Sequence, residues 1–142
     1  MSPSHRFQSF IDDLAAGVFK GALVTDDDTL RAFLTNDILD VRTASRKASL
    51  VEIPAGNGYS VGGYDTQNAA IRTGGEIAVT GANFAIVAKG GPIGPFRSLV
   101  LYDDSVEGDP LICWWSYDEK GLTLKDGESL SVSFGDAMFV VK

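Results

Sequence analysis

The sequence predicts a mainly β protein, a β-sandwich or jelly-roll-like domain with one N-terminal α-helix. Two observations favour this fold class. Short apolar stretches with alternating side chains recur about every eight to twelve residues, with turn residues between them, which is typical of sandwiches and barrels. Only one stretch, near the N-terminus, has the apolar spacing of a helix. The expected strands are residues 30–34, 50–53, 77–80, 83–89, 96–102, 110–117, 122–125, 129–134 and 137–141.

The chain length of 142 residues suits one hydrophobic core of ordinary size, so we expect a single domain over residues 1–142. Within it the sequence predicts a mobile arm at 1–6, a helix at 7–20 and a β-sandwich at 29–142. The composition, 44% hydrophobic and 22% charged, is close to the average of soluble globular proteins and indicates neither disorder nor a membrane span.

The expected helix has the sequence FQSFIDDLAAGVFK. Five apolar side chains recur at helical spacing and share one face. They are Phe7, Phe10, Ile11, Leu14 and Val18. Ser4 is the expected N-cap, and Gly21 is the expected end of the helix. A helix of this length is marginal alone, so we expect its apolar face to dock on the β domain.

The stretch GGPIGPFRSLVLYDD, residues 90–104, combines a bend, a strand and an acidic end. Such a stretch could be a catalytic loop, a ligand-binding loop or a purely architectural bend. From Phe96 onward both faces of the strand carry apolar side chains, so we expect a central strand that is covered on both sides. We therefore interpret the bend as architecture and the two aspartates as a solvated corner.

Two other segments carry strong turn signals. In LTLKDGESLSVSF the dipeptide Asp126-Gly127 predicts the bend of a hairpin. In AGNGYSVGGYDT four glycines allow positive φ angles and tight bends.

The charge and cysteine content exclude several function classes. A net charge of -7 with scattered basic residues argues against a nucleic-acid-binding surface. No apolar run reaches the about 20 residues that a membrane helix needs, so we expect no membrane partner. The N-terminus has no pattern of a secretory signal. The single cysteine, Cys113, cannot form an internal disulfide, which fits a protein made in a reducing cytoplasm.

The residues that carry enzyme chemistry are sparse, and the sequence predicts no catalytic site. The only histidine, His5, lies in the expected arm, so a histidine-based triad cannot be built. Cys113 lies in an apolar strand, where a thiol behaves as a small hydrophobic group. GGPIGP lacks the Lys-Ser/Thr ending of a phosphate-binding loop. We predict no cofactor.

Carboxylates are grouped at 26–28 and at 103–109. The second group, in YDDSVEGDP, offers oxygens that a calcium ion could use, but neither group has the ligand spacing of an EF-hand loop. A solvated acidic turn explains the same residues, and we predict no metal.

Trp114, Trp115 and Tyr117 could form an aromatic platform for sugars. In an alternating strand one of two adjacent tryptophans must face away from the core, so we expect at least one at the surface or in an interface. We favour core plus subunit interface over ligand binding.

Several motifs occur in one order: FQSFIDDLAAGVF, LRAFLTND, EIPAGNGYSVGG, GPFRSLVLYDD, DPLICWWSY and LKDGESLSVSF. Together they resemble a family of small virion structural proteins of tailed bacteriophages, over about residues 7 to 134. The basic stretch RTASRKASLVEIP and the tripeptide Cys113-Trp114-Trp115 depart from the family pattern.

The resemblance implies a non-enzymatic capsid decoration or cement protein that binds the outer face of the phage head. The expected partner is the major capsid protein, and the expected oligomer is a homotrimer. The expected location is the capsid exterior of the virion, after synthesis in the host cytoplasm. The alternatives are a tail-tube, neck or head-fibre subunit, or a carbohydrate-binding module that uses the tryptophans.

Under this hypothesis the expected contact residues come from four places in the chain. They are Arg6 and Phe7 of the arm, the basic residues Arg42, Arg46 and Lys47, Gly58 and Tyr59 of the glycine loop 56–63, and Trp115. Clustered cations suit an acidic patch on a shell. The alternative is a charged strand edge that resists pairing with other strands.

Overall fold

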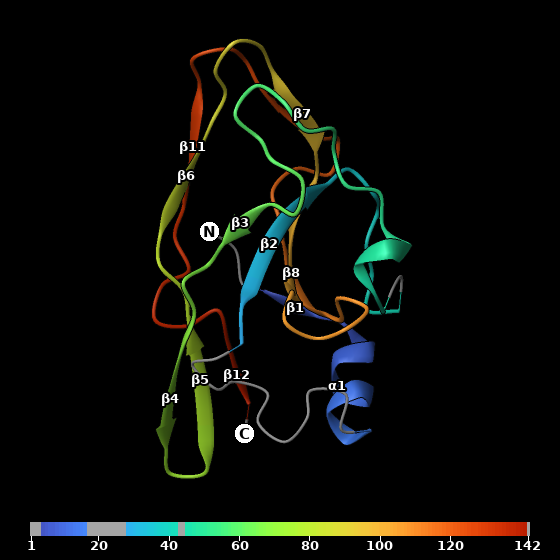
Figure 1. The fold of residues 1–142 in the computed structure, drawn as a ribbon, viewed down its shortest axis with the longest axis vertical. Helices are drawn as coiled ribbons and strands as arrows, with labels where there is room; N and C mark the ends of the chain where they lie inside the picture. The colour runs from blue at the N-terminus through green and yellow to red at the C-terminus, as the bar shows by residue number, and fades with distance from the viewer. Residues whose placement is uncertain (1–3, 17–27, 43–44, 142) are drawn as a thin grey trace.

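The computed structural model describes residues 4–16, 28–42 and 45–141. As predicted, this part of the chain is mostly β, with one short N-terminal helix, α1 (Gln8–Ala15), and several antiparallel sheets in a sandwich-like arrangement (Figure 1). None of the helical segments in the described ranges has the length and hydropathy needed to cross a bilayer.

The central sheet has five antiparallel strands in the order β1-β9-β8-β2-β3. Their bounds are β1 His5–Arg6, β2 Leu30–Thr35, β3 Tyr64–Asp65, β8 Ser98–Asp103 and β9 Leu111–Ser116. All six residues of β8 are buried. The prediction of a central strand covered on both faces is therefore confirmed.

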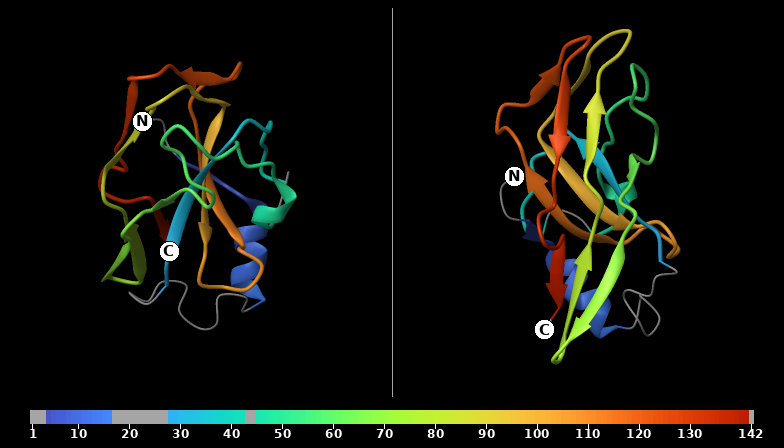
Figure 2. Two further views of the ribbon diagram at one scale, coloured as in Figure 1. Left: turned by 45° about the horizontal axis from the view of Figure 1, so that its top comes forward. Right: turned by 90° about the vertical axis from the view of Figure 1, so that its left-hand side faces the viewer.

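A second layer of strands covers one face of this sheet (Figure 2). It contains a three-stranded sheet, β12-β5-β4, and a ribbon of two strands, β11 and β6. The bounds are β4 Ala69–Thr73, β5 Glu76–Thr80, β6 Phe84–Val87, β11 Ser129–Val132 and β12 Phe139–Val141. The larger hydrophobic cluster lies between the layers, because it joins Leu99 and Leu101 of β8 to Val79 of β5 and Ile86 of β6. Strand β4 was not predicted; it begins with two alanines, and only Ile71 and Thr73 of its five residues are strong β formers.

A smaller cluster covers the opposite face of the central sheet. It contains Phe7, Phe33, Leu50, Val100, Tyr102, Leu111 and Trp114. Leu39 and Leu50 join this cluster from the described residues 36–42 and 45–53, which include the short 3-10 helix η1 (Lys47–Ser49). The predicted strand at 50–53 is wrong: a single bridge joins Thr35 to Glu52, and the segment is otherwise irregular.

Two further predictions about strand pairing need correction. The expected strand 96–102 is broken at Arg97, since β7 (Ile93–Phe96) pairs with β10 (Leu122–Leu124) while β8 pairs with β2 and β9. The expected hairpin at 122–134 does turn near Asp126, but its two strands do not pair with each other. β10 pairs with β7, and β11 pairs with β6. Turn chemistry predicted the bend, and packing partners decided the pairing.

The described N-terminal residues are not a free arm. His5 and Arg6 pair with Trp114 and Cys113 as strand β1, and the hydroxyl of Ser4 donates to the carbonyl of Met138. The N-cap of α1 is Phe7, with no side-chain capping bond, so Ser4 is not the cap. The helix is shorter than the predicted 7–20, and Val18 and Gly21 lie outside the described residues.

Candidate functional site

The structure places three of the predicted contact residues in the interior. Phe7 is fully buried, and Tyr59 and Trp115 are each 3% exposed. Trp114 is also buried, at 5% exposed. The expectation of a surface tryptophan is wrong, because hydrophobic clusters cover both faces of the central sheet and each face takes one indole.

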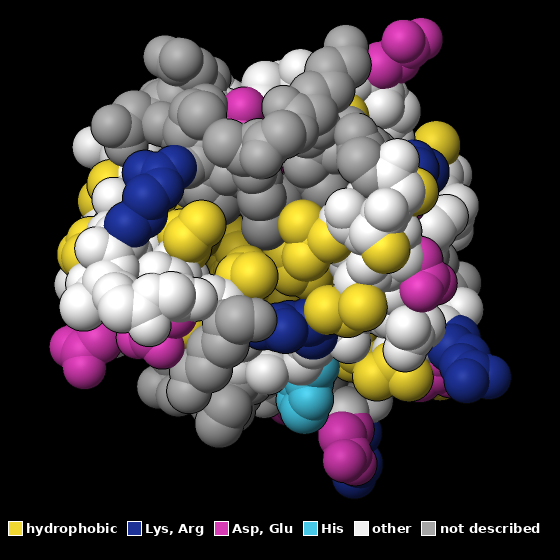
Figure 3. Space-filling model, turned by 90° about the horizontal axis from the view of Figure 1, so that it is seen from below, with side chains coloured by type: hydrophobic (Ala, Val, Ile, Leu, Met, Phe, Trp, Pro, Cys, Tyr) yellow, Lys and Arg dark blue, Asp and Glu magenta, His cyan; other side chains and the backbone are white. Residues whose placement is uncertain are grey.

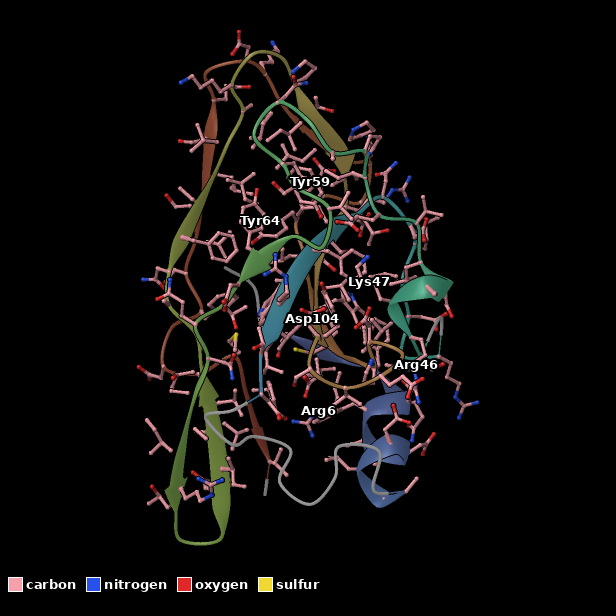
Figure 4. The ribbon with its side chains drawn as sticks, in the orientation of Figure 1. Arg6, Arg46, Lys47, Tyr59, Tyr64 and Asp104 are labelled. Atoms are coloured by element: carbon pink, nitrogen blue, oxygen red, sulfur yellow. The ribbon has the colours of Figure 1, made fainter. Side chains whose placement is uncertain are left out.

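Lys47, another predicted contact residue, is half-buried. Its ammonium nitrogen is 2.7 Å from Oε1 of Glu52 and lies 5.0 Å from the ring centre of Phe33 and 5.8 Å from that of Tyr102 (Figure 4). An ion pair and two cation–π contacts share one half-buried site. Lys47 therefore stabilises the layer that covers the sheet.

Glu52 joins three parts of the chain through its carboxylate. Besides Lys47, it accepts hydrogen bonds from the hydroxyl of Tyr59 at 2.6 Å and the backbone N–H of Gly62 at 2.8 Å. The same hydroxyl accepts a bond from the backbone N–H of Leu34 at 3.0 Å. Burial, followed by the bond to Glu52, raises the pKa of Tyr59 well above its ordinary value. Sequence reasoning did not single out Glu52, although a lone acid inside the apolar stretch LVEIP was the available signal.

Side chains of the central sheet hold the glycine loop through hydrogen bonds to its backbone carbonyls. Arg31 donates to the carbonyl of Gly63 at 2.7 Å, and the hydroxyl of Tyr102 donates to that of Gly62 at 2.8 Å. Gly63 has a φ of 78°, and a Cβ at this position would lie 1.9 Å from the carbonyl oxygen of Ala32. Only glycine fits there. Gly58 is exposed in the same loop, so a contact role for it stays a prediction.

Arg46 links the helix to the segment that covers the sheet. Its two terminal nitrogens donate to the two carboxylate oxygens of Asp13 at 2.8 and 3.3 Å. Asp13 is buried in α1, and Arg46 also forms a backbone bridge with Pro110. A two-pronged guanidinium–carboxylate pair fixes orientation as well as distance. The three basic residues therefore differ in role. Arg46 and Lys47 form ion pairs that stabilise the fold, whereas Arg42 is exposed.

Several exposed apolar side chains belong to α1 and to the segment that covers the smaller cluster. Of the seven large apolar side chains exposed among the described residues, four belong to α1 or to residues 36–42 and 45–53. We call these four together with Arg42 the outer face. Its residues are Ile11, Ile38, Val41, Arg42 and Val51.

Hydrogen bonds connect the parts of the outer face. The backbone N–H of Gln8 donates to the carbonyl of Val41 at 2.7 Å, which joins the start of α1 to the segment. The N–H of Val51 donates to the carboxylate of Asp37 at 2.8 Å, next to Ile38. Ile38 and Val51 are 77% and 70% exposed. Because these exposed apolar groups lie on a well-tethered segment, we treat the outer face as a candidate contact surface.

A small pocket of about 130 Å³ opens beside the outer face. Its lining residues include Ile38, Leu39, Trp114, Asp118 and Glu119. The pocket is smaller than the roughly 300–1,000 Å³ typical of cofactor sites. Its size suits one side chain of a protein partner.

The acidic corner after β8 is only partly solvated. Asp103 is fully buried and accepts hydrogen bonds from the N–H and the hydroxyl of Ser105, whereas Asp104 is exposed (Figure 4). Burial, with Asp104 as a second cause, raises the pKa of Asp109. Within the described ranges no three His, Cys, Asp or Glu side chains form a group that could hold a metal ion.

The remaining chemically active side chains have structural partners. Cys113 is buried, and this burial raises the pKa of its thiol far above the usual range. His5 stacks on Trp114 with ring centres 5.2 Å apart. Arg6 donates to the carbonyl of Val140 at 2.8 Å and lies over the ring of Phe10. Figure 3 shows the molecule from below the view of Figure 1, where hydrophobic side chains gather close to basic side chains and the histidine.

Comparison with known proteins finds no matching family model, no matching curated protein and no matching solved structure. The outer face is therefore the candidate site on the basis of its own geometry. It is exposed, mostly apolar, and held in place by the two ion pairs.

Proposed function

We propose that the protein is a non-enzymatic structural protein of a bacteriophage virion, a capsid decoration or cement protein. It binds the major capsid protein on the outer face of the head. A protein that binds the assembled shell better than its loose subunits shifts the equilibrium toward the closed shell. The ordered motifs along the chain and the β-sandwich-like fold support this proposal.

The outer face is the observation that carries the proposal. Arg46 ties it to α1, and Lys47 ties it to Glu52, so little conformational freedom is lost on docking. Ile38 and Val51 supply apolar area, and Arg42 supplies a positive charge on a protein whose net charge is -7. Arginine is enriched in protein interfaces, and apolar area is enriched at their buried centres.

Co-sedimentation of the purified protein with intact phage heads, and separately with tails, tests the proposal. We expect saturable binding to heads. The double variant Ile38→Ser with Val51→Ser and the single variant Arg42→Ala should each weaken it by about tenfold or more, equivalent to about 1.4 kcal/mol. Val87→Ser and Lys89→Ala are matched controls, because both residues are exposed on or beside β6, away from the outer face. Binding to heads that no outer-face variant weakens would contradict the assignment.

The alternatives give different results in the same experiment. Binding to tails alone would favour a tail-tube or neck subunit, and microscopy of decorated particles would locate a head fibre. The carbohydrate-binding alternative has lost its main support, because the two indole rings are 5% and 3% exposed and offer no stacking platform. The homotrimer stays a prediction, which sedimentation of the free protein would test.

A further inference from the structure

Four edge strands of the described chain, β1, β3, β4 and β12, are protected against pairing with another strand. Charged side chains lie on three of them: Arg6 on β1, Asp65 on β3 and Arg72 on β4. The edge of β12 is covered differently, because side chains of residues 4 and 6 donate hydrogen bonds to the carbonyls of Met138 and Val140. Charges and covering groups are the usual means by which proteins keep sheet edges from associating.

Strand β11 has neither of these protections, and the same holds for its neighbour β6 and for β10. Among the described residues β11 pairs with β6 alone, so its other side is an edge. The sequence SLSVS at 129–133 contains no charge and no proline, and its register with β6 contains no bulge. Ser129 and Ser131 are exposed, whereas Leu130 is half-buried against the larger cluster. This edge is regular and open to a further strand.

The hydrogen bonds at the start of the ribbon determine which residues face the edge. Ala88 donates to the carbonyl of Glu128 at 2.9 Å and accepts from the N–H of Gly127 at 2.8 Å, so its backbone points toward β11. Backbone direction alternates along antiparallel strands, and Ile86 therefore also points toward β11, at its partner Leu130. It follows that Ser129 and Ser131 direct their N–H and C=O groups outward, to the edge.

We propose that β11 pairs with β11 of a second copy of this chain, antiparallel and with the two-fold axis at Leu130. In this register Ser129 lies opposite Ser131 of the second copy. Both residues face the edge, so the pairing forms four N–H···O=C hydrogen bonds. Leu130 lies opposite its own copy, in a pair without hydrogen bonds, where side chains approach most closely.

The strand suits its own copy as a partner for two reasons. The alternation Ser-Leu-Ser reads the same in both directions, so one two-fold register satisfies every outward backbone group. The side chains on the solvent side are hydroxyls, which bring no like charges together. The half-buried Leu130 loses its remaining exposure against an identical leucine. Four hydrogen bonds and two leucines make a small contact, so we expect a dimer that depends on concentration.

Sedimentation equilibrium of the free protein between about 5 and 200 µM tests the stoichiometry, without phage particles. Two-fold pairing gives dimers, or hexamers where the predicted trimer also forms. Masses of only one or three chains at every concentration would overturn the proposal. Ser131→Lys places like charges across the two-fold axis and should halve the measured mass, from dimer to monomer or from hexamer to trimer. Ala85→Lys, on the neighbouring strand at the position opposite Ser131, should leave the mass unchanged.

Cysteine crosslinking tests the register. Leu130→Cys should form a disulfide-linked dimer under mild oxidation, because the two Cβ atoms face each other at about 5 Å. Ser129→Cys should remain uncrosslinked, because its copy lies two residues away along the strand, beyond the about 7 Å that a disulfide can span. The native Cys113 is buried and does not compete. Crosslinking of Ser129→Cys, or of neither variant, would overturn the proposed pairing.

Discussion

Replacing Tyr59 by phenylalanine removes one oxygen that serves two buried partners. The hydroxyl accepts the backbone N–H of Leu34 at 3.0 Å and donates to Glu52 at 2.6 Å. Leu34 is fully buried and Tyr59 is 3% exposed, so water cannot easily take the place of the lost oxygen. The ring itself stays, and the change in hydrophobic burial is small.

The expected cost follows from these two bonds. A buried N–H left without an acceptor costs about 1–3 kcal/mol, and a hydrogen bond to a charged group contributes about 1.5–3 kcal/mol. Glu52 keeps its bonds to Lys47 and Gly62, so the two effects do not add fully. We expect Tyr59→Phe to lower the free energy of unfolding by about 2–4 kcal/mol. For a chain of this length that corresponds to a fall in Tm of roughly 6–15 °C.

Tyr64→Phe is the matched control. Tyr64 packs on the ring of Phe84, and its buried hydroxyl has no hydrogen-bond partner among the described residues (Figure 4). Removing that oxygen should leave the free energy of unfolding unchanged within about 0.5 kcal/mol, or raise it. Urea and thermal unfolding followed by circular dichroism measure both variants. Equal stabilities for Tyr59→Phe and Tyr64→Phe would refute the role given to the Glu52 network.

Three further outcomes are expected. Gly63→Ala should abolish stable folding, because its Cβ would overlap the backbone, whereas Gly74→Ala, which has open space and a φ of 54°, should cost only about 1 kcal/mol in a thermal melt. Burial raises the pKa of Tyr102 and Tyr117 from 10.0 to about 12, so the fold favours the neutral phenols. Their contribution to stability is complete below pH 10 and is lost as the pH rises from 10 through 12, which tyrosinate absorbance and unfolding at alkaline pH will follow. Leu99→Ala should lower the free energy of unfolding by about 2–5 kcal/mol in urea, since Leu99 is fully buried in the larger cluster, and a loss below 1 kcal/mol would contradict that placement.

Periodicity predicted the elements of this fold better than their pairing. Strand β8 was expected to be central because both of its faces are apolar, and it is. The hairpin around Asp126 was predicted from local turn chemistry, yet β10 and β11 found other partners, because pairing depends on residues such as Ile93 and Ile86 that are distant in sequence. Alternation along one strand cannot show how many layers cover a sheet. For that reason Trp115 was expected at the surface and lies in the core.

The candidate site was predicted only in part, for a related reason. A basic run read from sequence looks uniform, but ion pairing depends on tertiary position. Arg46 meets Asp13 across 33 residues of sequence, and only Arg42 of the three is exposed. Exposed apolar residues such as Ile38 and Val51 gave no signal, because alternation in an irregular segment carries no information about which side chains face water.

The side chains of the outer face lie outside both hydrophobic clusters. Substitutions at Ile38, Arg42 or Val51 should therefore change stability by less than about 0.5 kcal/mol, as is usual at surface positions away from special contacts. Recognition and folding are then nearly independent properties of this chain. Under the proposed function, a lineage could change the shell that the protein binds through substitutions at a few surface positions, while Glu52, Lys47 and Arg46 keep the scaffold constant. Related chains should accordingly differ most on the outer face and least in the network beneath it.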